Sequence, residues 1–211
     1  AMDNLPAASA TAIKKLTFPD NPMFGLLFLE GGEHCPHLGE ARRVVEYPAD
    51  CSLGINLFNR AETRLEQLIP YGFEIINLRC IFQLTAQDLE KLEQLPTVTT
   101  LHLPKFADDS LLVALSKITW LKRLFLDDTL ITDEGLALLS RLSELEELSL
   151  SGTNLNGSFL NYLSKMTKLK KLDLSRTKIG DGCLAYLSNF IALEELDLRE
   201  TSVSNLGLPF L

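Results

Sequence analysis

Hydrophobic residues recur with a fixed period over most of this chain. Four segments begin 24 residues apart, at Leu121, Leu145, Leu169 and Leu193, and share the pattern LxxLxLxxT followed by a polar break. After the break, most of these segments carry leucines spaced by three and four residues. Alternation with a period of two predicts a short β-strand, and the second spacing predicts a helix or 3₁₀ turn. We therefore expect one strand and one short helix in each unit.

Weaker copies of the pattern precede these four units. One begins at Val98 and is one residue shorter, another begins at Phe73, and the weakest begins at Ser52. Such a period is typical of repeat proteins, in which a unit buries its apolar face only against its neighbours. Stacking predicts two buried columns along the strands: Leu124, Leu148, Leu172 and Leu196, then Leu126, Leu150, Leu174 and Leu198.

The units resemble leucine-rich repeats over residues 73–211, with a looser match from residue 52. They are similar to short bacterial-type repeats and to the cysteine-containing repeats of F-box proteins, which share the ITDxGL element found at residues 131–136. The resemblance implies an α/β solenoid with a curved parallel sheet on its concave side and short helices on its convex side. It also implies protein partners.

The chain departs from many such families at one position of the repeat. Where those families carry Asn or Cys, this sequence has Thr129, Thr153, Thr177 and Thr201. A buried hydroxyl can satisfy the backbone where the chain leaves the strand, as Asn would. We therefore assign these threonines a structural role.

The first fifty residues have a different character. They hold five of the nine prolines and no clear repeat, and strands are expected in the runs that begin at Gly25 and Arg43. A terminal repeat leaves an apolar edge that must be covered. We therefore expect a capping segment over residues 1–50 and the solenoid over residues 51–211, with clear repeats from residue 73.

The residues between the buried leucines of each strand are expected to form the concave face and to contact a partner. The candidates are Arg79, His102, Arg123, Phe125, Asp127, Glu147, Lys171, Asp173, Glu195, Asp197 and Arg199. Aromatic residues and Arg are enriched at binding hot spots, although charges on an exposed sheet also serve solubility. A role in solubility does not explain an aromatic residue at position 125 of this face. Trp120 either covers the hinge between helix and strand or contacts the partner.

Charge and cysteine usage narrow the functional classes. The net charge of −8 argues against nucleic acid and against anionic membrane surfaces as partners. Apolar runs are too short for a membrane-spanning helix. Cys35, Cys51, Cys80 and Cys183 show no paired spacing, which predicts reduced thiols and a cytoplasmic protein.

The stretch GGEHCPHLGE, residues 31–40, raises the question of a metal or catalytic site. His34, Cys35 and His37 could supply metal donors or a Cys–His nucleophile. Their spacing does not match the usual zinc motifs, and we find no orienting group or oxyanion site. We expect a polar surface loop of the cap, no cofactor and no enzymatic activity.

The sequence thus predicts a non-catalytic module that binds a protein through its concave face. A more specific alternative is an adaptor, either a substrate receptor for ubiquitin ligation or a bacterial virulence effector. The remaining alternative is an enzyme or metal site at the N-terminal loop.

The C-terminal stretch NLGLPFL leaves Leu206, Leu208, Phe210 and Leu211 without a further repeat to cover them. An apolar edge of this kind is an association site, so we expect self-association there. Two alternatives are a longer parent protein and a tail that folds Phe210 back over the core.

Overall fold

The computed structural model describes residues 72–210 without a break. It also describes Leu65, Leu68 and strands within residues 13–17, 25–30, 39–40, 44–48 and 52–58.

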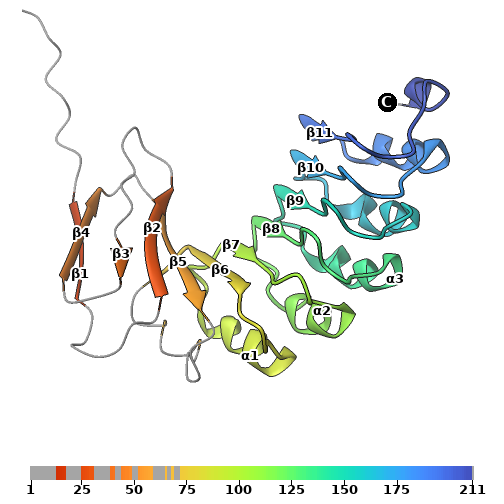
Figure 1. Cartoon of the computed structure of the whole chain (residues 1–211). Coiled ribbons are helices and arrows are strands. Elements are labelled where there is room, and N and C mark those ends of the chain that lie inside the picture. The colour runs from red at the N-terminus through yellow and green to blue at the C-terminus, as the bar shows by residue number, and fades with distance from the viewer. Residues whose placement is uncertain are drawn as a thin grey trace, which may run out of the picture.

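The repeats build one continuous parallel sheet. Its strands are β5 (Ser52–Phe58), β6 (Ile75–Cys80), β7 (Thr100–His102), β8 (Arg123–Phe125), β9 (Glu147–Ser149), β10 (Lys171–Asp173) and β11 (Glu195–Asp197). Each strand pairs in parallel with the next one along the chain, so equivalent positions of successive units lie side by side. Figure 1 shows the strands along the inner side of an arc and the helices along its outer side. The solenoid expected from the repeat is confirmed.

The N-terminal strands extend this sheet and add a second one. β2 (Gly25–Glu30) pairs antiparallel with β5, and β3 (Gly39–Glu40) pairs antiparallel with β2. β1 (Ile13–Thr17) and β4 (Val44–Pro48) form a separate antiparallel pair. Of these strands, β2 and β4 match the sequence prediction, and β1 is additional.

The predicted surface loop at residues 31–40 needs one correction. Its last two residues, Gly39 and Glu40, belong to β3 and pair with Leu27 and Leu26 of β2. A strand of two residues is too short to show the alternation of apolar and polar positions by which strands are predicted. The sequence pattern therefore could not reveal β3. His34, Cys35 and His37 lie outside the described residues.

The convex side carries short helices whose type follows their N-terminal capping. The α-helices are α1 (Ala86–Glu90), α2 (Asp109–Leu115) and α3 (Asp133–Leu136), and each begins after a capping side chain: Thr85, Asp108 and Thr132. The 3₁₀ helices are η2 (Lys91–Gln94), η3 (Ala137–Arg141), η4 (Ser158–Lys165), η5 (Asp181–Asn189) and η6 (Leu208–Phe210). η4 and η5 follow glycines, which offer no side-chain cap. These two units, whose own N-cap residue makes no side-chain hydrogen bond, form no α-helical turn.

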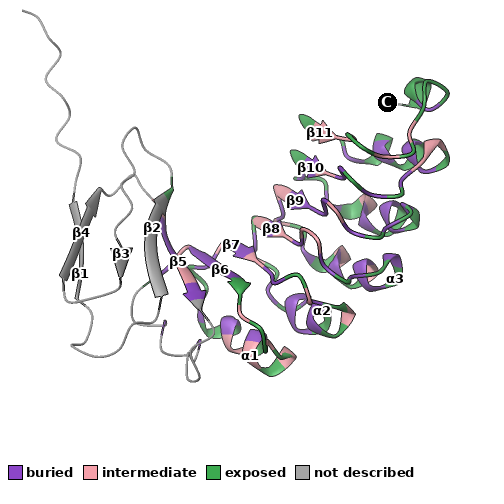
Figure 2. Cartoon of the chain, viewed as in Figure 1, coloured by how far each residue is buried: buried purple, intermediate pink, exposed green. Residues whose placement is uncertain are grey.

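The core lies between the sheet and the helices. The leucine columns of the strands are fully buried from Leu101 and Leu103 to Leu172 and Leu174. Leu196 and Leu198 of the last unit are only half-buried, because β11 is the edge strand of the sheet that the structure describes. Figure 2 shows this change from buried residues in the middle units to exposed and intermediate residues at β11.

The threonine at the end of each strand has the structural role expected of it. Its hydroxyl donates a hydrogen bond of 2.5–2.7 Å to the carbonyl oxygen of the leucine three residues earlier. The residue before each threonine has a left-handed backbone, with φ of +55° at Asp128, +70° at Gly152, +57° at Arg176 and +57° at Glu200. The same tight turn therefore ends the strand in four successive units.

Candidate interaction surface

The alternation of each strand turns one set of side chains away from the helices. The sheet register aligns Arg123, Glu147, Lys171 and Glu195 in one row across the strands. A second row contains His102, Phe125, Ser149, Asp173 and Asp197. Arg79 is the penultimate residue of β6, and Asp127 and Arg199 lie in the turns after β8 and β11. The structure thus brings all eleven candidate residues to one face of the sheet.

An aromatic pair stands near the middle of this face. The rings of His102 and Phe125 stack with centroids 4.1 Å apart and planes inclined by 6°. Burial, and then the charge of Arg79, lower the pKa of His102 to about 4, with Arg123 acting in the same direction and Glu30 against it. The imidazole is therefore neutral at pH 7. Its buried Nδ1 has no hydrogen-bond partner among the described residues.

The two arginines beside the aromatic pair are engaged within the chain. The Arg123 guanidinium donates to Glu30 of β2 at 2.6 Å and to the Thr100 hydroxyl at 2.9 Å. Arg79 forms an ion pair with Asp127, which also accepts a hydrogen bond from the Ser149 hydroxyl. Partly exposed ion pairs contribute little to stability and can exchange partners. Both arginines thus have acceptors within the described residues.

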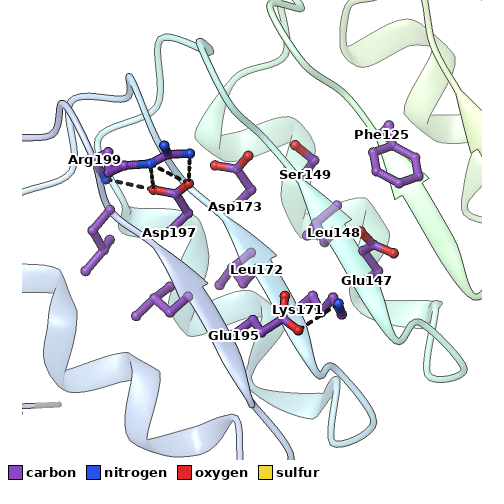
Figure 3. A pocket seen from close by; sticks show the side chains of 12 residues that line it. Phe125, Glu147, Leu148, Ser149, Lys171, Leu172, Asp173, Glu195, Asp197 and Arg199 are labelled. Carbon is purple, nitrogen blue, oxygen red and sulfur yellow. Dashed lines mark hydrogen bonds and ion pairs between the residues drawn. The ribbon is translucent and has the colours of Figure 1, made fainter.

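Charges toward the C-terminal end are also paired, with two exceptions. Lys171 bonds Glu195 at 2.7 Å, and Arg199 binds Asp197 through contacts of 2.5–3.0 Å (Figure 3). Asp173 accepts the backbone N–H of Ser175 at 2.9 Å but forms no ion pair within the described residues. Glu147 forms none there either. Two carboxylates of the face are thus available to an outside cation.

The concave face is hollowed beside these carboxylates. One hollow spans β8 to β11 and includes Glu147, Lys171 and Asp197; another lies toward the strand ends and includes Arg79, His102 and Asp127. The two hollows share Phe125, Ser149 and Asp173. This shared region is the centre of the surface.

Several residues that shape the surface were not among the candidates. Glu30, which holds Arg123, lies 93 residues earlier in the chain, and no local pattern could reveal that contact. Lys105, Asp128 and Arg176 form a row of charges along the rim: Lys105 bonds Asp128 at 3.0 Å, and Arg176 approaches Asp128 at 3.4 Å. Asp128 and Arg176 occupy the left-handed turn position of their units, two periods apart. The repeat of the sequence could therefore have pointed to this row of charges.

Trp120 covers the hinge between helix and strand and is not turned outward toward a partner. The side chain is half-buried against the core, and its indole N–H donates to the Val98 carbonyl at 3.1 Å. Such a partner satisfies the polar end of the ring within the chain. The structure therefore favours a hinge cover over a partner contact.

The part of the chain that the structure describes contains no cluster suited to a metal ion, and one of its free cysteines, Cys80, is exposed. No three His, Cys, Asp or Glu side chains gather there in a way that could hold a metal ion. Cys183 is buried, and burial raises the pKa of its thiol. None of the described helices combines the length and apolarity needed to cross a membrane.

Comparisons with known proteins identify the fold. No protein-family model matches the chain, and no curated protein matches its sequence. The crystal structure of a TLR13–ssRNA13 complex aligns with 73% of this chain and 23% of its own, at 21% identity and a TM-score of 0.55. An internalin from Listeria monocytogenes aligns with 72% of this chain and 49% of its own, at 16% identity and a TM-score of 0.49.

A leucine-rich-repeat protein from Leptospira interrogans aligns with 70% of this chain and 42% of its own, at 18% identity and a TM-score of 0.49. The chain thus spans about half or less of these three proteins. The likeness to the TLR13 structure, together with the parallel sheet and short helices, shows an α/β leucine-rich-repeat solenoid.

Proposed function

We propose that the chain is a recognition module that binds a protein partner through the concave face of its sheet and catalyses no reaction. The observation that carries this proposal is the half-exposed aromatic pair beside two carboxylates without ion pairs among the described residues, on a face whose other charges are mostly paired. Aromatic groups that bury on contact and charges that find a partner are typical of hot spots.

The charge of the chain favours protein over nucleic acid as the partner. The TLR13 structure contains single-stranded RNA, but this chain carries a net charge of −8, and its concave arginines are paired with Glu30, Asp127 and Asp197. Nucleic-acid binding requires basic groups that neutralise phosphates. The adaptor alternatives, a ubiquitin-ligase substrate receptor or a virulence effector, would use the same face and differ only in the partner. The cytoplasmic location stays a prediction, supported by Cys80 and Cys183 being unpaired.

The test begins with identification of a partner by pull-down and mass spectrometry, followed by calorimetric titration of variants. We expect Phe125→Ala with Glu147→Lys to weaken binding at least tenfold, about 1.4 kcal/mol, while the melting temperature falls by only a few degrees. Glu147 forms no ion pair among the described residues and acts on Lys171 only through its electric field, so reversal of its charge breaks no ion pair there.

Tyr162→Ala provides the control on the convex side. Tyr162 is exposed on η4, and its truncation should leave affinity unchanged. Loss of binding in Tyr162→Ala but not in the concave variant would show that the partner uses the other surface.

A further inference from the structure

The Phe125 ring has one occupied face and one open face. His102 on β7 stacks against it with nearly parallel planes, so the opposite face of the ring looks along the sheet toward β9. The neighbour there is Ser149, a small residue whose hydroxyl is turned to Asp127. Asp173 follows on β10. Neighbouring strands lie about 4.8 Å apart, so roughly 10 Å of sheet separates the backbones of Phe125 and Asp173.

This geometry leaves a slot with an aromatic wall, a small floor and an acidic wall. The three residues that form it, Phe125, Ser149 and Asp173, are the ones shared by both hollows of the concave face. A flat cation can stack on an aromatic ring and reach a carboxylate on its other side, since cation–π contacts extend to about 6 Å. Two strand spacings, about 10 Å, leave room for a flat cation between the two walls.

The electrostatic surroundings of the slot are negative. Asp173 and Glu147 carry no ion pair among the described residues, and Asp127 contributes a third carboxylate that Arg79 neutralises. The cations that line the two hollows beside Asp173 have other partners: Lys171 pairs with Glu195, Arg199 with Asp197, and Arg176 with Asp128 and the Ser151 hydroxyl. Arg199 acts on Asp173 only through its electric field. A cation that enters the slot therefore meets carboxylates without a competing partner among the described residues.

We propose that the slot receives an arginine side chain of the protein partner. The guanidinium stacks on the open face of Phe125 and donates to the Asp173 carboxylate, with Glu147 at the rim. A guanidinium fits better than a lysine ammonium because it is planar, stacks on rings and donates in a fork that matches a carboxylate. The inference rests on the proposed function and names the chemistry that the concave face selects.

The test uses N-acetyl-arginine amide as the probe and the whole chain as the receptor. Titration followed by ¹⁵N NMR should give saturable shifts of the Ser149 and Asp173 amides, with N-acetyl-lysine amide at least fivefold weaker. Asp173→Asn should weaken the arginine probe at least fivefold. Asparagine still accepts the Ser175 N–H, so the turn after β10 is retained.

Asp197→Asn is the matched control. Asp197 lies in the same row of the sheet, but Arg199 already occupies its carboxylate, so this variant should bind the probe as the wild type does. Ser149→Leu should fill the slot and abolish the shifts.

Three results would overturn the inference: equal binding of the lysine probe, equal loss in Asp197→Asn, or no saturable shift at Ser149 and Asp173. A concave-face protein partner whose affinity survives Asp173→Asn sinks the inference and leaves the proposed function standing. Probe binding that requires Asp173, in a chain whose protein partner uses the convex side, would show that the slot selects arginine but would contradict the proposed function and the role of the slot in partner binding.

Discussion

At the scale of single residues, His102 shows how the surface is tied to the fold. Its imidazole lies between Arg79 and Arg123 and against the Phe125 ring, where a proton would add a third positive charge to a half-buried site. The neutral ring is the form that the folded chain prefers. The stacked pair at the centre of the surface therefore depends on pH.

We predict a loss of stability in mild acid that originates at His102. Its pKa is about 4 in the folded chain and 6.5 in the unfolded chain, so this residue's contribution is complete above pH 6.5, declines as pH falls, and is lost once pH passes about 4. The shift corresponds to roughly 2–3 kcal/mol after allowance for the exposed part of the ring. Urea unfolding of the wild type and His102→Phe at pH 7 and pH 4.5 measures it.

His102→Phe keeps an aromatic ring in the stack but binds no proton. The variant should lose less unfolding free energy than the wild type between the two pH values, by roughly 2 kcal/mol. Identical pH dependence of the two proteins would place the acid sensitivity in the carboxylates instead.

At the scale of elements, an aspartate of one unit caps the turn of the next. Asp133 is buried and accepts the backbone N–H groups of Asn156 and Gly157 at 3.0 Å and of Phe159 at 3.3 Å. Asp109 receives Thr132 in the same way, and Asp181 receives Ser204. These carboxylates fix each convex turn to its neighbour.

The same contact explains the glycine of the ITDEGL element. A Cβ on Gly135 would lie 1.9 Å from an oxygen of Asp109, and one on Gly207 would lie 2.4 Å from an oxygen of Asp181. The glycine leaves room for the aspartate of the preceding unit. The aspartate of one repeat and the glycine of the next thus form the contact that joins successive repeats on the convex side.

We predict that Asp133→Ala lowers the free energy of unfolding by about 2–4 kcal/mol, because three backbone N–H groups lose a charged acceptor. The midpoint of urea unfolding measures this loss. Glu134→Ala is the control: its side chain is exposed at the neighbouring position of α3, and its removal should cost well under about 1 kcal/mol. Equal effects of the two substitutions would contradict a joint at Asp133.

Local spacing predicted most of the fold and part of the surface. The leucine columns, the threonines and the face of each candidate follow from the period, because spacing alone decides which side chains point inward. Local spacing could not predict the ion pairs of the surface. Arg79 pairs with Asp127 and Arg123 with Glu30, over separations of 48 and 93 residues. The Asp133 joint was likewise hidden, since capping of a neighbouring unit leaves no hydrophobic pattern.

At the scale of the whole molecule, the sheet ends in an apolar edge. Leu206 is 81% exposed and Phe210 is 51% exposed beside β11, whose leucines are only half-buried. Apolar clusters of this kind are association sites. The exposure of Phe210 is at odds with a tail folded back over the core.

We predict that this chain self-associates through that edge as its concentration rises, measured as apparent mass by light scattering. Phe210→Asp should keep it monomeric, because a charge cannot be buried in an apolar contact without a partner. Phe82→Asp is the matched control, since Phe82 is 74% exposed in the loop between β6 and α1. A wild type that stays monomeric at every concentration would disprove the prediction.

One joint of the solenoid differs from the others, and it lies behind the slot. Where the units of α2, α3 and η5 carry Asp109, Asp133 and Asp181, the unit of η4 has Gly157. A Cβ added to Gly157 would lie 2.5 Å from the Cys183 sulfur, and no side-chain hydrogen bond joins η4 to η5 among the described residues. On the concave side, β9 and β10 remain bonded. Apolar packing and the backbone bond from the Lys178 N–H to the Leu155 carbonyl therefore hold this joint, in place of a capping carboxylate. Because β9 and β10 carry Ser149 and Asp173, we expect the spacing of the units at this joint to set the width of the slot.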